Sequence, residues 1–218
     1  MSESHKKTTI LLIRHGETEW NRGKVFRGTR DVPLNENGLR QASLLASALK
    51  ARRVNAAYTS PLQRARQTAE AAMRGRDVAI TVEPRLTDFC YGEWEGLQEA
   101  EVARRWPREH ALWLTRPEQV RPPGGGTLCE VSEAAFGAME ELAARHGGET
   151  VALFAHRVVN KLLVLAALGL GVERFPFVRL DNASVSELER TAAGYVLCLL
   201  NDTAHLRGDD AEPLSQDF

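Results

Sequence analysis

Histidine and arginine side chains follow three predicted strands of this sequence, at the point where each strand ends. They are Arg14 with His15, then Ser60 with Arg64 one turn into the next helix, and then His156 with Arg157. In an open α/β sheet, ligands bind beyond the carboxyl ends of the strands. We therefore expect two histidines and two or three arginines to converge on one crevice.

This set of side chains suits the transfer of a phosphoryl group from a phosphate monoester. Arginine offers planar, permanently charged donors that match a phosphate dianion. Neutral imidazole, whose pKa in water is about 6.5, attacks phosphorus at neutral pH without a metal. A carboxylic acid must then protonate the departing alkoxide and later activate water. The helices that follow the second and fourth predicted strands would add oriented N–H groups.

The elements that must position these side chains alternate between strands and helices. Continuous apolar runs predict buried strands over residues 8–13, 54–60, 78–82 and 150–155. Helical spacing and capping signals predict helices over residues 36–50, 62–74, 127–146 and 157–168. The first of these helices has Asn35 as its cap and an apolar face of Leu39, Ala42, Leu45, Ala46 and Leu49. Residues 184–188 and 195–200 predict a terminal hairpin. The order indicates a three-layer α/β/α fold with a mostly parallel central sheet.

The segment over residues 84–126 differs in composition from the rest of the chain. It holds three of the four tryptophans, several prolines and three consecutive glycines. We interpret it as a partly helical lid inserted into a single domain that spans residues 1–202. Residues 16–34 are expected to form a loop, and residues 203–218 a polar C-terminal tail.

The composition excludes several classes of protein. The 218 residues carry a net charge of -1 and no basic segment, which argues against a nucleic-acid partner. The first residues lack the apolar core of a signal peptide, and the apolar stretch Leu162–Val172 is too short to cross a bilayer. Three distant cysteines and six histidines show no metal-ligand spacing. We expect a cytoplasmic protein with no metal, cofactor or membrane partner, whose partner is a small phosphorylated metabolite; a homodimer remains open.

Four sequence blocks, in order along the chain, carry a family resemblance. They are Leu12 to Asn21 (LIRHGETEWN) with its continuation through residues 26–38, Ser60 to Ala69 (SPLQRARQTA), Leu86 to Leu97 ending in GEWEGL, and Phe154 to His156. The chain resembles the histidine phosphatase superfamily, in the branch that includes cofactor-dependent phosphoglycerate mutase. The resemblance covers about residues 8–190 and implies a phosphoglycerate mutase-like fold.

The resemblance also implies a role for individual residues. His15 would be the nucleophile that becomes phosphohistidine, and the groups that stabilise the phosphoryl charge around it would be Arg14, Arg64 and His156. Residues implied to bind the phosphate or line the entrance to the site are Asn21, Thr18, Arg27 and Gly28.

Three positions depart from the family pattern. Asp88 stands where phosphatases of the family usually carry a glutamate, and we expect it to be the proton donor, with Glu93 as the alternative. Arg157 replaces the glycine that usually follows the second histidine. Its guanidinium would either select an acidic substrate or point to solvent. Gly126 replaces a usual glutamate before a long helix.

Three functions fit these residues. The first is a phosphatase, which passes the phosphoryl group from His15 to water. The second is a mutase, which returns it to another hydroxyl group. Mutases of the family usually have longer chains, with a more basic segment after the third block. Here the corresponding segment, Gln98–Gln119, is short and of mixed charge, so we favour the phosphatase. The third is a non-catalytic phospho-ligand binding protein, against which the pair Arg14-His15 argues.

Overall fold

The computed structural model describes residues 7–207, and their six strands form one sheet in the order β3-β2-β4-β1-β5-β6. The strands are β1 (Thr8–Arg14), β2 (Ala56–Thr59), β3 (Ile80–Val82), β4 (Thr150–Ala155), β5 (Val185–Thr191) and β6 (Gly194–Asp202). The first four pair in parallel, whereas β5 and β6 are antiparallel. The predicted mostly parallel sheet is confirmed, and the terminal hairpin extends it at one edge.

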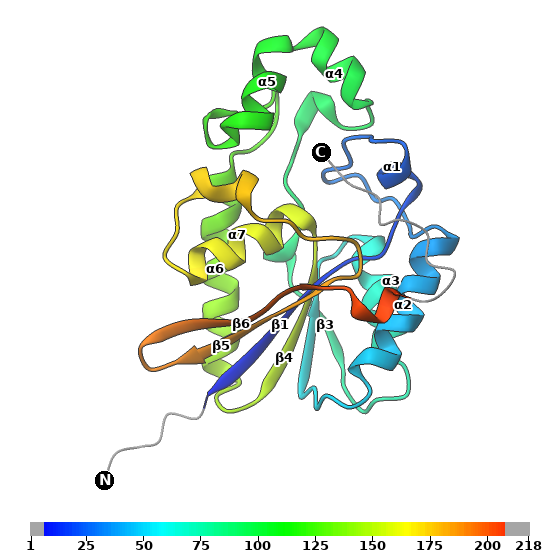
Figure 1. Ribbon diagram of the computed structural model, residues 1–218, viewed down its shortest axis with the longest axis vertical. Coiled ribbons are helices and arrows are strands. Elements are labelled where there is room, and N and C mark those ends of the chain that lie inside the picture. Colours follow the sequence, from blue (N-terminus) through cyan, green and yellow to red (C-terminus); the bar gives the residue numbers. More distant parts are fainter. Residues whose placement is uncertain (1–6, 208–218) are drawn as a thin grey trace.

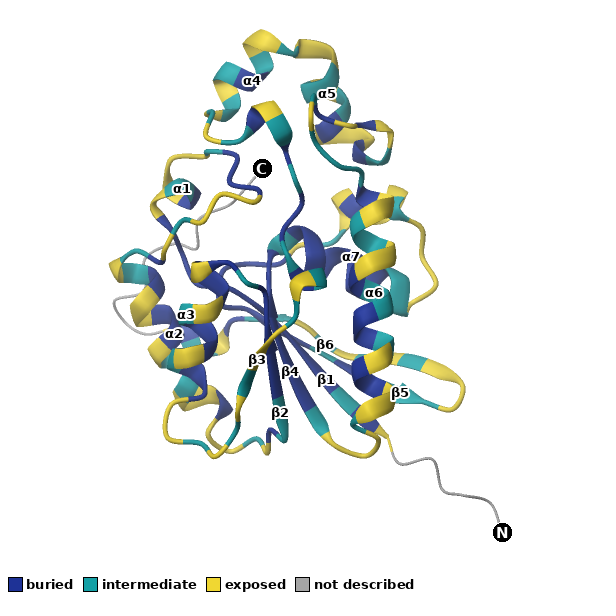
Figure 2. Cartoon of the chain, turned by 180° about the vertical axis from the view of Figure 1, so that it is seen from behind, coloured by how far each residue is buried: buried dark blue, intermediate teal, exposed yellow. Residues whose placement is uncertain are grey.

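Helices cover both faces of this sheet (Figure 1). On one face lie α2 (Glu36–Leu49) and α3 (Gln63–Ala72), and on the other α6 (Leu128–Arg145) and α7 (Arg157–Ala167). Along β1, Ile10 and Leu12 pack with α6 and α7, whereas Leu11 and Ile13 pack with α2 and α3. Side chains of a strand alternate between faces, so a strand covered on both sides needs an unbroken apolar run. The expected three layers are confirmed, with buried strands between the helices (Figure 2).

The apolar face expected for α2 is partly wrong. Asn35 caps the helix as predicted, because its side chain accepts a hydrogen bond of 2.8 Å from the Gly38 backbone N–H. Leu39, however, is 51% exposed. The buried stripe begins one residue earlier, at Gly38, because the loop after β1 packs against that glycine.

Two boundaries differ from the sequence expectation for local reasons. β2 begins at Ala56 rather than at residue 54. Before it, the Asn55 backbone N–H donates to the Thr150 carbonyl, and the Asn55 side-chain oxygen accepts from the Thr150 N–H, in place of regular strand pairing. The expected loop over residues 16–34 contains a short helix, α1 (Glu19–Arg22).

The expected polar tail also differs at its start. Ala204–Leu206 form the 3-10 turn η5, in which Leu206 is 6% exposed, and Thr203 before it is 5% exposed. The turn packs beside α2. The prediction of a tail is therefore wrong for residues 203–207, because Thr203 and Leu206 are buried, and residues 208–218 lie outside the described part of the chain.

The segment over residues 84–126 lies beyond the carboxyl ends of the parallel strands (Figure 1). It contains α4 (Glu99–Arg105), α5 (Pro107–Thr115) and the 3-10 turns η1 (Pro84–Leu86), η2 (Gly92–Trp94) and η3 (Pro117–Gln119). Its aromatic side chains form a separate cluster that includes Phe89, Trp94 and Trp113 and rests on Val158 and Leu162 of α7. The partly helical character is as expected, and the role of a lid stays a prediction. No helix within residues 7–207 combines the length and the apolar character needed to span a membrane.

Candidate active site

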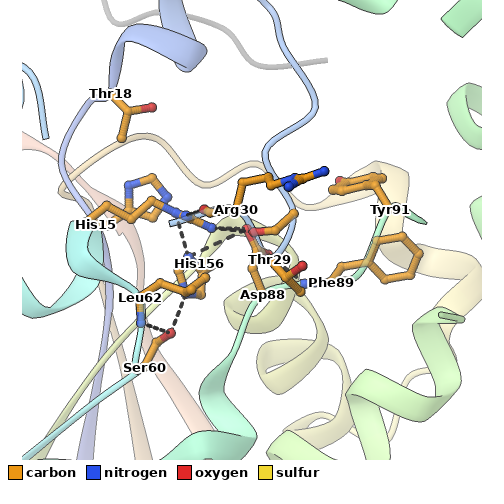
Figure 3. Close-up of polar contacts among 12 residues, drawn as sticks. His15, Thr18, Thr29, Arg30, Ser60, Leu62, Asp88, Phe89, Tyr91 and His156 are labelled. Atoms are coloured by element: carbon orange, nitrogen blue, oxygen red, sulfur yellow. Dashed lines mark hydrogen bonds and ion pairs between the residues drawn. The ribbon is translucent and has the colours of Figure 1, made fainter. Parts of the chain in front are cut away.

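Three central strands deliver both predicted histidines and Ser60 to one place (Figure 3). Arg14 ends β1 and His15 follows it, Ser60 follows β2, and His156 follows β4. Arg64 reaches the same point from the first turn of α3, and its side chain is fully buried. The ring centroids of His15 and His156 are 5.3 Å apart, and Arg64 Nε lies 3.2 Å from His156 Nδ1. The convergence predicted from the strand ends is present.

The His15 ring is fixed in one tautomer. Its Nδ1 lies 2.6 Å from the carbonyl oxygen of Gly16, and because a carbonyl only accepts, the hydrogen sits on Nδ1. The Nε2 lone pair therefore remains for an incoming electrophile. Asn182 holds the backbone at this point, since its Nδ2 donates to the carbonyls of His15 (3.1 Å) and Gly16 (3.2 Å). A side chain on Gly16 would lie 2.6 Å from the Gly38 carbonyl, so the turn requires glycine.

His15 is neutral at physiological pH in this environment. Burial lowers its pKa well below the usual value, and the charges of Arg64, Arg14 and Arg27 act in the same direction. Only the neutral ring has a free lone pair on Nε2. The surroundings of His15 therefore favour its nucleophilic form.

Four acceptors hold the Arg64 guanidinium. It donates to the carbonyls of Gly28 (2.7 Å) and Arg30 (2.8 Å), to His156 Nδ1, and to Asp88 at 3.0 Å. Burial lowers the pKa of Arg64 to about 10, and Asp88 opposes that shift, so the group remains charged at neutral pH. A charged donor fixed in this way can stabilise a developing phosphoryl charge without reorganising.

Gly28 contributes through its backbone. Its φ of +53° lies in the region that favours glycine, and a Cβ there would meet Glu95 Oε1 at 2.1 Å. Glu95 accepts hydrogen bonds from the backbone N–H groups of Thr29 (2.9 Å) and Tyr91 (3.1 Å). Glu95 thus ties the loop that holds Arg64 to the segment around η2. Arg27, which is 9% exposed, lines a small hollow together with Gly28.

His156 is neutral as well. Arg64 donates to its Nδ1, so the hydrogen lies on Nε2, which donates to Ser60 Oγ at 2.7 Å. Burial lowers the pKa of His156 to about 3, although the charge of Asp88 opposes the shift. In this arrangement His156 orients Arg64. Its Nδ1 could donate to a phosphoryl oxygen only after taking up a proton.

The two carboxylates considered as proton donor lie in different places. Asp88 is 8% exposed, accepts from the Phe89 backbone N–H at 3.0 Å, and lies 3.6 Å from His156 Nδ1. Glu93 is exposed on η2. Burial alone would raise the pKa of Asp88, but the charges of Arg64 and Arg27 and the hydrogen bond from the Phe89 N–H oppose burial, and that pKa lies below its usual value. Only Asp88 shares contacts with Arg64 and His156.

Thr18 and Asn21 cap the short helix α1. Thr18 is the N-cap of α1, and its side chain accepts from the Asn21 backbone, while Asn21 Oδ1 accepts from the Thr18 backbone N–H at 2.9 Å. Both side chains are buried. Their predicted contact with phosphate stays a prediction. Arg14 donates to the carbonyl of Leu180 at 2.7 Å.

Sequence reasoning missed Asn182, Glu95 and Thr68 as parts of this site. Thr68 accepts from the Gly16 backbone N–H at 3.0 Å and donates to the Arg64 carbonyl. Thr68 lies within the second sequence block and Glu95 within the third, and their place in these blocks is the only feature of the sequence that points to them. Asn182 lies in a polar stretch just before β5 and carries no signal of its own.

A group of potential metal ligands occurs elsewhere in the described chain. Glu187, Glu189 and Cys198 bring their ligand atoms within 4.8 Å of one another on β5 and β6. Lys7 pairs with Glu189 at 2.8 Å, and Arg52 pairs with Glu187. These acids serve ion pairs on the hairpin and do not belong to the site around His15.

Comparison with known proteins agrees with this geometry. The family model of the histidine phosphatase superfamily (branch 1) matches residues 10–203. Phosphoserine phosphatase 1 of Hydrogenobacter thermophilus is 32% identical over 90% of this chain and 93% of its own length. A probable phosphoglycerate mutase, GpmB of Cronobacter sakazakii, is 33% identical over 90% and 94%. The solved structure of Bacillus stearothermophilus YhfR superposes with a TM-score of 0.88 at 32% identity, covering 91% of this chain and 98% of that one.

The expected resemblance is therefore confirmed over nearly the whole described chain. The match covers all three strand ends that carry the buried histidines and arginines. This chain belongs to the histidine phosphatase superfamily, branch 1.

Proposed function

We propose that this chain is a metal-independent phosphatase, which hydrolyses a small phosphomonoester through a phosphohistidine at His15. In the first step His15 Nε2 bonds to phosphorus, the bond from phosphorus to the ester oxygen breaks, and Asp88 gives its proton to that oxygen. In the second step the Asp88 carboxylate takes a proton from water, the hydroxide oxygen bonds to phosphorus, and the N–P bond breaks. Inorganic phosphate leaves, and both side chains return to their starting forms.

The observation that carries this proposal is the state of His15. Its Nδ1 hydrogen is engaged by the Gly16 carbonyl, and burial keeps the ring neutral, so Nε2 is a ready nucleophile. Arg64 lies beside it with a fixed positive charge, and Arg14 precedes it directly. Neutral imidazole together with fixed arginines supplies the nucleophile and the charge compensation that a metal would otherwise provide.

Asp88 must be protonated when the ester oxygen departs, although its pKa is low in the unliganded site. Binding of the phosphate dianion should raise the pKa of Asp88. The dianion compensates the positive charge of Arg64 and places negative charge next to Asp88, and a nearby like charge raises the pKa of a carboxyl group. Substrate binding itself would thereby convert Asp88 into an acid.

A mutase is the second candidate, because a relative at 33% identity is named a probable phosphoglycerate mutase. The product distinguishes the two. With 3-phosphoglycerate as substrate, a phosphatase releases inorganic phosphate, whereas a mutase yields 2-phosphoglycerate. We expect inorganic phosphate. The cytoplasmic location and the homodimer stay predictions.

Trapping the intermediate tests the mechanism. The protein is mixed with substrate, quenched in base to preserve the acid-labile N–P bond, digested and analysed by mass spectrometry. We expect one phosphate on the peptide that contains His15, unchanged by prior treatment with EDTA. Turnover without any phosphorylated peptide, or equal turnover by His15→Ala, would reject a phosphohistidine mechanism. Phosphate binding without turnover by the wild type would favour the non-catalytic alternative.

A further inference from the structure

Asn182 is buried beside the nucleophile, and its side chain contacts the backbone that holds the His15 ring. It is 2% exposed, and its Nδ2 donates to the carbonyl oxygens of His15 at 3.1 Å and Gly16 at 3.2 Å. The Gly16 carbonyl also accepts from His15 Nδ1 at 2.6 Å. We propose that Asn182 is a positioning residue, which keeps the hydrogen on His15 Nδ1 throughout the reaction and thereby speeds the breakdown of the phosphohistidine. The inference rests on the proposed function and concerns its second step.

The orientation of the Asn182 amide follows from its neighbours. Both of the carbonyls that it contacts can only accept hydrogen bonds, so the amide nitrogen, and not the amide oxygen, faces them. Within residues 7–207 the buried Asn182 Oδ1 has no hydrogen-bond partner. Both side-chain hydrogen bonds that Asn182 makes to this part of the chain therefore go to the turn that carries His15.

The backbone next to Asn182 is directed at the same turn. The Ala183 N–H donates to the His15 carbonyl at 3.1 Å, and Ala183 has a φ of +54°, a left-handed conformation that is uncommon for a residue with a side chain. Such backbone persists only where the surrounding structure enforces it, and it is frequent at functional sites. β5 begins at Val185, two residues later, and pairs with β1. The pairing of these strands therefore fixes Asn182 relative to His15.

The hydrogen on His15 Nδ1 decides how readily the ring leaves phosphorus. In the second step the water oxygen bonds to phosphorus, Asp88 takes a proton from that water, and the electron pair of the N–P bond returns to Nε2. With the hydrogen on Nδ1, the ring leaves as neutral imidazole. Without it, the ring would leave as an imidazolate anion, which is a far poorer leaving group. A contact that holds this hydrogen therefore favours transfer of the phosphoryl group to water.

The Gly16 carbonyl holds this hydrogen only while it points at Nδ1. A carbonyl oxygen has two lone pairs, so it can accept from His15 and from Asn182 together. Asn182 bridges this carbonyl and the preceding one, and it thereby prevents both peptide groups of the turn from rotating. In the phosphorylated ring the Nδ1–H carries positive charge, and hydrogen bonds from a charged donor are the strong ones. The contribution of Asn182 should therefore be larger in the breakdown of the phosphohistidine than in its formation.

A single-turnover experiment tests the proposal. Excess protein is mixed with para-nitrophenyl phosphate, and the rates of nitrophenol release and of phosphate release are measured at pH 6 and pH 8. At pH 8, Asn182→Ala should slow phosphate release about tenfold or more, because small displacements within a site have large effects on rate, and nitrophenol release only a few-fold. The loss should shrink toward pH 6, since acid restores the hydrogen on Nδ1. Equal slowing of both steps, a loss independent of pH, or no loss would overturn the proposal.

Asn201→Ala is the matched control. Asn201 supports the same segment from β6, because its Oδ1 accepts from the Asp181 N–H at 2.7 Å and its Nδ2 donates to the Asp181 carboxylate at 2.9 Å. This variant should lower the melting temperature, as Asn182→Ala does, and keep the wild-type rate of phosphate release at both pH values. Asn182→Leu retains a similar shape without a donor and should reproduce the loss of Asn182→Ala. The same loss in the control, or wild-type release by Asn182→Leu, would overturn the proposal.

Nitrogen-15 NMR of the histidine rings separates this inference from the proposed function, and its first readout needs no Asn182 variant. The His15 ring, assigned by comparison with His15→Ala, should carry its hydrogen on Nδ1 in the wild type and show both tautomers in Asn182→Ala. A wild-type ring with the hydrogen on Nε2 would overturn the proposal. If no phosphohistidine forms while the tautomers behave as expected, the proposed function fails and the positioning of the ring by Asn182 stands. If phosphohistidine forms and Asn182→Ala changes neither the tautomer nor the rates, this inference fails alone.

Discussion

The histidines and arginines around His15 extend from the ends of the central strands β1, β2 and β4 or from the first turn of α3, and Asp88 joins them from the segment between η1 and η2. A cavity beside Arg14 is lined by α5, α7, η4 (Val172–Phe177) and the segment that follows η4. Around His15, Arg64 and His156 are fully buried and hold one another. The cavity lining combines buried Lys161 with the half-exposed Arg179.

The difference separates two tasks. Groups that stabilise the charge of phosphoryl transfer must be fixed before the reaction, and strand ends within a packed core fix them. Groups that recognise the alcohol can lie on surface segments, where a change in side chains does not disturb the core. Substitutions of His15 or Arg64 should therefore affect all substrates alike, while substitutions in the cavity should affect them selectively.

His15→Ala should give the largest loss. Without Nε2 there is no acceptor for the phosphoryl group, and the loss of a nucleophile lowers kcat by about 10⁴-fold or more. The same loss is expected with para-nitrophenyl phosphate and with 3-phosphoglycerate, measured by phosphate release. His110→Ala on α5 is the matched control and should retain activity. A loss confined to one of the two substrates would break the distinction between the two regions.

Arg64→Lys should lower kcat/KM by about 10²–10³-fold for both substrates, since a fixed charged donor is lost at the transition state. Lysine cannot reach the Gly28 carbonyl, the Arg30 carbonyl and His156 together, so the melting temperature should fall too. Arg66→Lys, on the same helix but exposed, is the control for a conservative change. Activity of Arg64→Lys close to that of the wild type would show that the fixed guanidinium is unnecessary.

Asp88→Asn should slow turnover by about 100-fold, as expected for loss of a general acid. The loss should be larger with glycerol 3-phosphate than with para-nitrophenyl phosphate, because the nitrophenolate leaves without protonation. Comparing kcat/KM for the two esters, which reports the phosphorylation step, checks this. Glu93→Gln is the control and should change neither value. If Glu93→Gln carries the loss instead, the proton donor has been assigned to the wrong carboxylate.

The cluster around His15 could be predicted from the sequence because the ends of buried strands can be located from their apolar runs. Continuous apolar runs located β1 and β4, and the parallel arrangement placed Arg14, His15 and His156 together. The strand that ends at Ser60 placed Arg64 beside them, and the third sequence block added Asp88. Each of these residues is specified by a local pattern.

The supporting contacts could not be predicted in the same way. Asn182 lies 167 residues from His15 in the sequence and meets it only because β5 pairs with β1. Leu39 is exposed rather than buried, because the packing of Gly38 against the loop after β1 decides how α2 is rotated about its axis. The cavity depends on how α5 and η4 approach α7. These features depend on tertiary contacts that no local pattern encodes.

The two buried histidines predict a pH dependence of stability that belongs to the strand-end region. The pKa of His156 is about 3 and that of His15 is well below its usual value, whereas both are about 6.5 in the unfolded chain. The unfolded state therefore binds protons that the folded state does not. The free energy of unfolding should be constant above about pH 6.5 and fall with acidification, by at most about 1.4 kcal/mol per pH unit for each histidine.

Urea unfolding at pH 7, 6 and 5 measures this slope. The window avoids the range in which carboxylates titrate. His156→Gln keeps a polar side chain of similar reach and should flatten the slope by the share of one histidine. An unchanged slope in that variant would mean that His156 does not contribute, and it would weaken the account of two neutral rings in the site.

Glu95→Gln should give the smallest effect, and it tests whether the two regions are coupled. Glu95 joins Thr29 of the loop that holds Arg64 to Tyr91, the partner of Arg157. Hydrogen bonds to a charged acceptor are stronger than those to a neutral one by about 1 kcal/mol, so we expect a loss of that order in urea unfolding. A few-fold decrease in kcat/KM should accompany it, because Arg64 is held less firmly. Glu99→Gln, at the start of α4, is the control and should affect neither quantity.

A double-mutant cycle decides whether Glu95 acts through Arg64. Residues that act through a shared contact show non-additive effects, whereas independent residues add. If Glu95 positions Arg64, Glu95→Gln should change kcat/KM far less when Arg64 is already lysine. It should still lower the stability, because Tyr91 and Thr29 lose the charged acceptor in both backgrounds. Equal kinetic effects in the two backgrounds would mean that Glu95 supports the fold without positioning the guanidinium.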